Sequence, residues 1–328
     1  TSLLNLEGKE AAALALAREN VEFARSTIGE NAFNYAVMLN GLASALRRNG
    51  HIEASIDVRR QSLVVYKRVL PPENSNVIRQ RTILAGELMA AGGYAEARGE
   101  YVEALEQVDR NESLRNDRAR FLSGLGEAEF NLGRHAEALR LVQQAVEEST
   151  SRVGHDHPNT LYRQRAFIDF ALDVGRLDEA EHRLDAIARG YRARPDTPRA
   201  SIATLYGSLA ARLAIARGNP AAAEQLSRRA LSELKELKAT TETQWVLHAL
   251  GASLAAQRRW KEAIAPLEES LAVARRAKQR DDYVAIIEVQ LGIVEYELDR
   301  SADAIARVRA AGAVLARYPG QPKAQQQA

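Results

Sequence analysis

Two histidines flank an aspartate in the segment GHDHPNT, residues 154–160, which is the stretch of this chain most typical of metal binding. Imidazole nitrogens bind zinc well, but a zinc site needs three or four ligands. Near His155, Asp156 and His157 there is no second group of His, Asp or Glu at ligand spacing. We therefore predict no metal site. Gly154 and Pro158 instead suit a connector that ends one helix and begins the next.

Other patterns that could support chemistry are also incomplete. The segment GLGEAEFNLG, residues 124–133, contains Gly-x-Gly, but the dinucleotide fingerprint needs a third glycine where Glu129 stands. The chain has no cysteine, which excludes disulfides, thiolate metal sites and cysteine nucleophiles. It also lacks a P-loop, a Gly-x-Ser-x-Gly elbow and a His-Glu-x-x-His motif. These observations predict that the chain is not an enzyme, has no catalytic residues and needs no cofactor.

Composition narrows the class of protein further. The 328 residues include 45 Lys and Arg against 43 Asp and Glu, so no global charge favours nucleic acid or an anionic membrane. No run of about 18 apolar residues is present, which predicts no membrane insertion by this chain. The abundance of Ala, Leu, Arg and Glu favours helix. The first residue is Thr rather than Met, so we expect a fragment or a processed product, in either the cytoplasm or the periplasm.

One phrase recurs along the chain and indicates the elements that must position any site. It begins with a turn residue and ends with an acid and an alanine, as in GRHAEAL at 133–139, GGYAEAR at 92–98, GRLDEAE at 175–181 and RRWKEAI at 258–264. A shortened copy is GHIEAS at 50–55, and weaker copies stand at 218–224 and 299–305. The alanines repeat about every 42 residues, at Ala54, Ala97, Ala138, Ala180, Ala223, Ala263 and Ala304.

A small residue precedes each turn in almost every copy, and it predicts helix pairs. These residues are Ala43, Ala85, Gly126, Ala211, Gly251 and Gly292, with Ile168 as the exception. Two antiparallel helices approach closely where one presents a small side chain. We therefore predict first helices at 34–48, 75–91, 116–131, 159–174, 200–216, 242–257 and 282–298. Second helices are expected at 52–69, 94–109, 135–150, 177–191, 220–237, 261–277 and 301–317, with an extra helix near 8–27.

The pattern resembles the tetratricopeptide repeat in its long variety of about 42 residues, the kind found in kinesin light chains. The match rests on the Leu-x-x-Leu-Ala of Leu39, Leu42 and Ala43, on the turn glycines and on the Glu-Ala pairs. The resemblance implies an all-α fold, a right-handed α-solenoid of antiparallel helix pairs forming a tetratricopeptide-like superhelix. We expect one repeat domain over 1–318, with a half repeat at 1–33, about seven pairs at 34–318 and a disordered tail at 319–328.

Function in such arrays lies on the concave face of the first helices, where a peptide or partner helix binds. The repeat phase predicts which side chains line this face. The candidate binding residues are Asn40, Arg47, Arg79, Arg120, Ser123, Tyr162, Arg165, Arg212, Trp245 and His248. Arginine suits carboxylate capture and an aromatic side chain suits an apolar anchor, so the expected partner is a peptide or protein with acidic groups. The alternative is that Asp169 and Glu127 of the chain itself neutralise these arginines, in place of a ligand.

Several functional hypotheses stay open at this point. The first is a protein-interaction module, or a sensory one, in the regulatory region of a larger bacterial signalling protein, similar to tetratricopeptide regions that follow Ser/Thr kinase domains. The alternative is a sensor of a small ligand or peptide signal that controls an attached effector domain. No polar helix caps the last pair, so a homodimer through that end is a further possibility. The sequence does not name the partner.

Overall fold

The structure, a computed structural model, describes residues 10–155, 157–193, 199–240, 242–277, 279–299 and 301–317. Within these residues the regular secondary structure is helical and no strand occurs, which confirms the predicted all-α class. The predicted tail at 319–328 and the first nine residues of the predicted half repeat lie outside the described residues. None of the described helices is both long enough and apolar enough to cross a bilayer.

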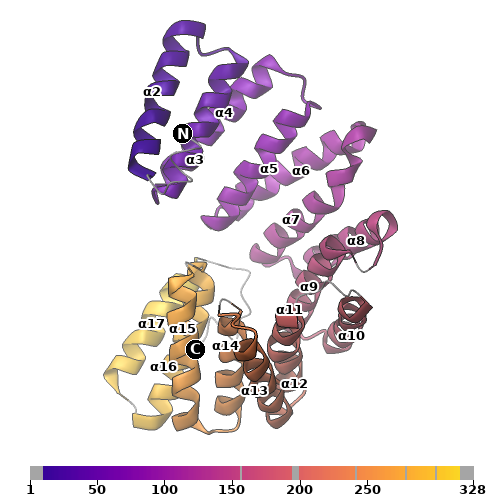
Figure 1. Ribbon diagram of the computed structural model, residues 1–328, viewed down its shortest axis with the longest axis vertical. Coiled ribbons are helices and arrows are strands. Elements are labelled where there is room, and N and C mark those ends of the chain that lie inside the picture. Colours follow the sequence, from indigo (N-terminus) through magenta and orange to yellow (C-terminus); the bar gives the residue numbers. More distant parts are fainter. Residues whose placement is uncertain are drawn as a thin grey trace. The chain divides into compact units, whose positions relative to one another are not determined.

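The helices alternate between the first and the second member of successive pairs (Figure 1). The first helices are α3 (Phe33–Arg48), α5 (Ser75–Ala90), α7 (Arg118–Asn131), α9 (Pro158–Asp173), the run α11 (Arg199–Thr204), η2 (Leu205–Ala210) and α12 (Ala211–Ala216), α14 (Thr243–Ala256) and α16 (Asp281–Asp299). The second helices are α4 (Ile52–Val69), α6 (Tyr94–Arg110), α8 (His135–Val153), α10 (Leu177–Ala193), α13 (Pro220–Glu236), α15 (Trp260–Arg276) and α17 (Ala302–Leu315). Helix α2 (Glu10–Ile28) precedes the first pair, and the short 3-10 helix η1 (Glu112–Asp117) precedes α7. Every predicted boundary lies within three residues of the observed one.

The turn inside each pair explains why the recurring glycine marks the end of a first helix. At Gly133 the backbone φ is +78°, and the N–H of Arg134 donates to the carbonyl of Glu129 at 2.9 Å. A residue in the left-handed region closes a helix in this way, and glycine adopts it without a Cβ clash. In the turn between α14 and α15, Arg258 takes the same conformation with φ +59°.

The small residues before the turns lie where the two helices of a pair touch. A Cβ on Gly251 would come within 2.5 Å of the Leu267 side chain of the second helix, so α14 and α15 approach as closely as their backbones allow. The alanines after the turns are fully buried at Ala97, Ala138, Ala180, Ala223, Ala263 and Ala304.

The assignment of Ala54 to this position is wrong, because Ala54 is exposed and Ser55 is buried. The Ser55 hydroxyl donates to the carbonyl of Ala43 at 2.8 Å, so Ser55 faces the small residue of the first helix. Ser55 is the fourth residue of α4, as Ala97 is the fourth residue of α6. The copy GHIEAS is one residue shorter than the others, so matching its Glu-Ala pair to theirs assigns the packing position to Ala54 instead of Ser55.

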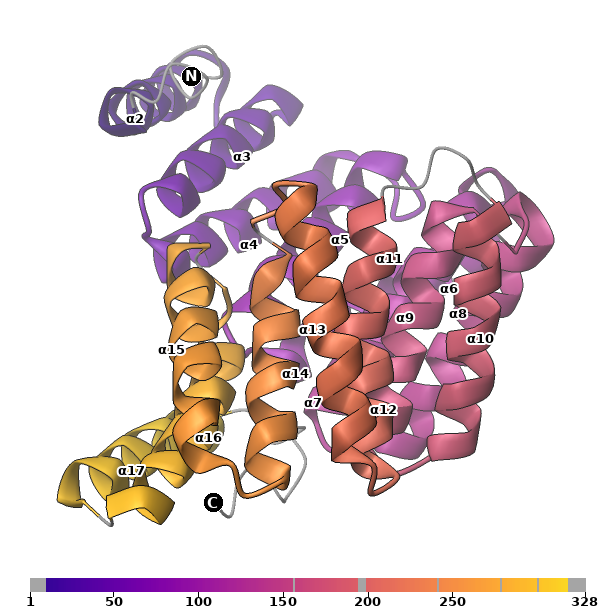
Figure 2. The same cartoon turned by 60° about the horizontal axis from the view of Figure 1, so that its bottom comes forward.

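The chain forms two compact units, Thr1–Ala128 and Glu129–Ala328, and the boundary falls inside α7. A single repeat domain over 1–318 stays a prediction. Within the second unit, α12, α13, α14 and α15 lie side by side (Figure 2). Both units are built of antiparallel helix pairs, which confirms the predicted solenoid architecture for each of them.

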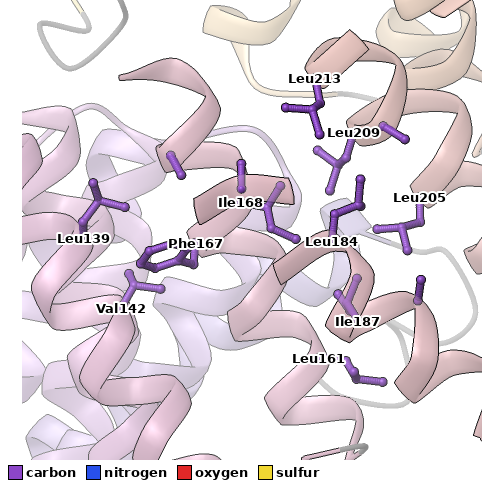
Figure 3. Close-up of a cluster of buried hydrophobic side chains, with 14 residues drawn as sticks. Leu139, Val142, Leu161, Phe167, Ile168, Leu184, Ile187, Leu205, Leu209 and Leu213 are labelled. Carbon is purple, nitrogen blue, oxygen red and sulfur yellow. The ribbon is translucent and has the colours of Figure 1, made fainter. Parts of the chain in front are cut away.

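The core of the second unit starts from α9, whose buried side chains face both neighbouring second helices. Phe167 and Ile168 belong to a single apolar cluster with side chains of α8 and α10 and of the next first helix (Figure 3). Its other labelled members are Leu139, Val142, Leu161, Leu184, Ile187, Leu205, Leu209 and Leu213. Burial of this kind is the main stabilising term in a repeat array, because each pair completes its core against its neighbours. The cluster therefore fixes the orientation of α9 and, with it, of the exposed residues on the opposite side of that helix.

In the first unit, oppositely charged side chains of neighbouring helices are buried together. Arg59 of α4 and Glu87 of α5 are 4% and 3% exposed, and their Nη2 and Oε1 atoms lie 2.8 Å apart. Arg81 of α5 is 2% exposed and pairs with Glu100 and Glu103 of α6. Buried charges of this kind need their partners, because removal of one leaves the other uncompensated in a medium of low dielectric constant.

Candidate functional site

In the first unit, two of the predicted binding residues converge on the buried Arg59–Glu87 pair. Asn40 donates to the hydroxyl of Tyr66 at 3.3 Å and accepts from Arg59 at 3.4 Å. Arg47 is 60% exposed, and its guanidinium lies 3.9 Å from the Glu87 carboxylate. Both side chains are thus partly engaged by the fold itself.

Two of the other predicted residues of the first unit, Arg79 and Arg120, have local partners. Arg79 donates to the Asn76 amide oxygen at 2.8 Å, one turn earlier on α5. Arg120 is about half exposed, lies 3.8 Å from Asp117 and stands over the ring of Phe121. Ser123 is half-buried on α7. Among the described residues, no hydrogen bond, ion pair or ring contact joins Arg79, Arg120 and Ser123 to one another.

The second unit gathers its predicted residues more closely. Arg212 of α12 bridges two carboxylates of α9, with Nη1 2.7 Å from Asp169 Oδ1 and Nη2 2.7 Å from Asp173 Oδ1. These side chains keep about 35%, 36% and 20% of their surface accessible. The first helices of neighbouring pairs are therefore joined by a charged bridge that remains open to solvent, and Asp169 partners an arginine as the alternative hypothesis expected.

An aromatic group stands next along this face. The rings of Trp245 on α14 and Tyr283 on α16 have centroids 4.1 Å apart and are tilted by 42°. His248 contacts the same tyrosine edge-on at 5.7 Å. Three side chains from two first helices thus form one aromatic cluster, in which Trp245 and His248 both contact Tyr283.

Tyr162 and Arg165 complete this surface on α9. Tyr162 is 67% exposed, and Arg165 lies one turn later on the same face as Asp169. Arg165 forms no ion pair or hydrogen bond within the described part of the chain, but its charge acts on Tyr283. We call Arg165, Asp169, Asp173, Arg212, Trp245, His248 and Tyr283 the first-helix cluster.

Three titrating groups of the first-helix cluster have strongly shifted pKa values. Burial raises the pKa of Asp173 to about 6, against the opposing charge of Arg212. Burial and the nearby Arg212 guanidinium lower the pKa of His248 to about 4, so its imidazole is neutral at physiological pH. Burial also raises the pKa of Tyr283. Such a grouping of shifted pKa values is typical of functional sites, although ion-pair networks also produce it.

A local departure from α-helix precedes Arg212. Residues Leu205–Ala210 form a π-helix inside an otherwise continuous helical run. Leu205 is fully buried, whereas Tyr162 of α9 is 67% exposed and Trp245 of α14 is half-buried. The wider π turn changes the phase between the two halves of the helix, so that Leu205 points into the core while Arg212 stays beside Asp169.

The segment GHDHPNT is a connector, as predicted. Gly154 has φ +92° and follows the end of α8. His157 is the N-cap of α9, and its Nδ1 accepts from the backbone N–H of Asn159 at 3.2 Å, while the ring of His155 lies 3.2 Å from the Gln164 amide. Asp156 lies outside the described residues. No three His, Asp or Glu side chains of the described ranges are grouped to hold a metal ion.

The sequence reasoning missed two members of the first-helix cluster. Asp173 lies one turn after Asp169 on the same face of α9, and Tyr283 is the third residue of α16, as Trp245 is the third residue of α14. Helical periodicity could therefore have included both. What it could not supply is the approach of α16 to α14, which makes Tyr283 the point where Trp245 and His248 meet.

Comparison with known proteins identifies the repeat. A family model described as the tetratricopeptide repeat matches residues 118–159 and 243–277. The matched segments contain the pairs α7–α8 and α14–α15, which are therefore identified as tetratricopeptide repeats, as the resemblance implied. No curated protein matches the chain.

Solved structures share the fold at low sequence identity. Nearly identical TPR-like repeats from a Podosopora anserina protein named for kinesin light chain give a TM-score of 0.53 at 20% identity, over 58% of this chain and 90% of theirs. A Rap protein complexed with Competence and Sporulation Factor gives 0.58 at 13% identity, over 94% and 87% of the two chains. The Rap conjugation gene regulator of plasmid pLS20, in complex with a Phr peptide, gives 0.61 at 16% identity, over 92% and 84%. At these identities the likeness concerns the fold alone.

Proposed function

We propose, from the tetratricopeptide repeats of this chain, that it binds a peptide or an extended segment of a partner protein on the first-helix cluster. The chain then acts as an interaction or sensory module, and a regulatory place in a signalling protein is part of the same proposal. The observation that carries it is the combination of Arg165, which has no ion pair or hydrogen bond among the described residues, with the half-buried Trp245–Tyr283 aromatic pair. Aromatic and arginine side chains are the residues that most often dominate the energy of an interface.

Each part of the first-helix cluster has a distinct task in this proposal. Arg165 offers guanidinium donors that no carboxylate of the described residues occupies, and they suit a ligand carboxylate. Trp245 and Tyr283 offer ring faces for an apolar side chain. Tyr162, exposed one turn before Arg165, extends the surface for a longer segment. The Rap structures, which contain bound peptide or factor in an array of the same fold, support a peptide as the kind of ligand.

The test is selection of a phage-displayed random peptide library on the immobilised full chain. Selected peptides are then titrated against the wild type and against Arg165→Gln and Trp245→Ala. We expect each substitution to weaken binding by about tenfold or more, since a charge-assisted hydrogen bond or an aromatic anchor contributes about 1.5–3 kcal/mol.

The matched control is Arg229→Gln, which removes an exposed arginine of the second helix α13. Like Arg165 it has no ion pair in the described ranges, but it lies on a second helix and is exposed, whereas Arg165 is half-buried. Binding to Arg229→Gln should equal binding to the wild type. Peptides that bind Arg165→Gln and Trp245→Ala as tightly as they bind the wild type would contradict the proposed site.

A further inference from the structure

Several glycines inside the described helices have no packing reason to be glycine. A Cβ added to Gly251 would overlap a leucine of the second helix, so that glycine permits close contact between helices. A Cβ added to any of the open helical glycines would meet nothing within 4 Å, and these are Gly41, Gly86, Gly99 and Gly312. Glycine is a poorer helix former than alanine, so an open helical glycine lowers stability without improving packing.

Two of the open glycines lie on neighbouring first helices of the first unit, Gly41 on α3 and Gly86 on α5. The two helices are adjacent, because the guanidinium of Arg59 contacts both of them. Ser44, one turn after Gly41, and Gly86 are exposed, while Thr82, one turn before Gly86, is half-buried. We call Gly41, Ser44, Thr82 and Gly86 the glycine surface. It carries no side chain larger than threonine, so another chain can approach the backbones of these helices closely.

A buried donor between the same two helices lacks an acceptor. Arg59 is 4% exposed, and its Nη atoms lie beside Asn40 and Ser44 of α3 and Glu87 of α5. Its Nε–H donates to no acceptor among the described residues. A buried donor without an acceptor costs free energy, and an oxygen atom that a ligand brings between the two helices can offset that cost.

The charge beside the glycine surface is positive. Arg59 and Arg47 share the carboxylate of Glu87, with Arg59 at 2.8 Å and Arg47 at 3.9 Å. Two guanidinium groups and one carboxylate leave one net positive charge, and it lies on Arg47, which is 60% exposed. Arg47 is one turn after Ser44, and Glu87 directly follows Gly86, so this charge borders the glycine surface. A carboxylate is the group complementary to it.

We infer that the glycine surface of the first unit binds an extended peptide segment that carries an acidic group. The main chain of the segment lies over Gly86, where the missing Cβ admits a backbone that a side chain would hold off. Its carboxylate lies at Arg47. This site is separate from the first-helix cluster of the second unit, so the inference does not rest on the proposed function.

A methyl group at position 86 has opposite effects on the fold and on binding. Alanine favours helix and its Cβ meets nothing within 4 Å, so Gly86→Ala should raise the melting temperature by about 2–4 °C by circular dichroism. The same methyl group occupies space that the peptide main chain uses, so affinity should fall by about tenfold or more. The matched control is Gly99→Ala, an open helical glycine of the second helix α6 in the same unit. It should raise the melting temperature and leave binding unchanged.

The binding probe is a phage-displayed random peptide library, applied to the full chain in two steps. Phage that bind the immobilised variant Gly86→Leu are removed first, and the remainder is selected on the wild type. The first step also removes peptides that bind the first-helix cluster, because Gly86→Leu leaves that cluster intact. Failure of the proposed function therefore does not affect the result. The recovered peptides should bind the wild type and Gly99→Ala equally, and Gly86→Ala about tenfold or more weakly.

A double-mutant cycle tests the acidic group. Each acidic residue of a recovered peptide is changed to its amide, and both forms are titrated against the wild type and Arg47→Gln. The amide form should lose about tenfold or more in affinity for the wild type, since a hydrogen bond between charged groups is broken, but little for Arg47→Gln.

Four results would contradict the inference. Recovery of no peptide above background, or of peptides that bind Gly86→Ala as tightly as the wild type, would overturn it. Dependence on Gly86 without dependence on Arg47 would overturn the acidic group. A wild type that sediments as a dimer beside a monomeric Gly86→Leu would show that a second copy covers this surface, against the peptide assignment. A melting temperature of Gly86→Ala below that of the wild type would contradict the open space at position 86.

Discussion

Replacement of Asp173 by asparagine is expected to stabilise the second unit at neutral pH, although it removes one partner of Arg212. Burial raises the pKa of Asp173 from 3.8 to about 6, more than the attraction of Arg212 lowers it. The protonated form is therefore favoured by folding. The stability that it contributes is present below about pH 4 and is lost as the pH rises through about 6.

The magnitude follows from the shift. Each pKa unit corresponds to about 1.4 kcal/mol, so ionisation of Asp173 lowers the free energy of unfolding by about 3 kcal/mol at high pH relative to low pH. About half of that change, roughly 1.4 kcal/mol, falls between about pH 5 and about pH 7.5. Asparagine has nearly the same shape and does not titrate, so Asp173→Asn should lack this loss.

The assay is urea denaturation followed by tryptophan fluorescence. The only two tryptophans of the chain are Trp245 and Trp260, and both lie in the second unit, so the signal reports on that unit alone. The difference in unfolding free energy between Asp173→Asn and wild type should grow in favour of the variant by about 1.4 kcal/mol from about pH 5 to about pH 7.5.

The control for this experiment is Asp178→Asn, because its carboxylate is exposed and paired with an arginine. Its stability should follow that of the wild type across the pH range. If Asp173→Asn also runs parallel to wild type, the burial of Asp173 does not shift its pKa in the way described here. A variant that is more stable but binds peptide less tightly would fit a residue kept for function at a cost in stability.

Three further results are expected. Gly251→Ala should lower the unfolding free energy by about 1–3 kcal/mol, because its Cβ would overlap a buried leucine, while Gly312→Ala, with nothing within 4 Å, should raise it by up to about 1 kcal/mol in the same fluorescence assay. Arg59→Leu should destabilise the first unit by about 3–5 kcal/mol by circular dichroism, since Glu87 stays buried, and adding Glu87→Leu should recover most of the loss. His157→Ala should cost about 1 kcal/mol as a lost helix cap, whereas an effect only in the presence of zinc would contradict the connector assignment.

The helix pairs could be predicted from the sequence because their packing depends on local, repeated residues. The turn glycine ends the first helix, and the small residue before it permits close contact, as Gly251 shows against Leu267. The error at Ala54 arose because the copy GHIEAS is one residue shorter than the others. Only the burial of Ser55 shows which residue packs against the first helix. The division into two units and the π turn at Leu205–Ala210 could not be predicted from the repeat period.

The sequence named Arg165, Arg212, Trp245 and His248 of the first-helix cluster but not Asp173 or Tyr283, and a binding role for any of them stays a prediction. The repeat phase placed Trp245 and His248 on one face, and in the structure both contact Tyr283, which the repeat phase did not indicate. The sequence treated Arg212 as a ligand-binding arginine, whereas it bridges Asp169 and Asp173. Pairing between helices about 40 residues apart depends on their relative rotation, and the period alone does not fix that rotation.

The central claim is that a peptide binds on the first-helix cluster of the second unit, and photo-cross-linking tests it most directly. Benzoylphenylalanine is placed at Tyr162, which is 67% exposed beside Arg165, and at Ile305, which is 37% exposed on the second helix α17. With peptides selected on the wild-type chain, we expect cross-links from position 162 that excess unlabelled peptide abolishes, and none above background from position 305. Equal cross-linking from both positions, or cross-linking from position 305 alone, would contradict the claim.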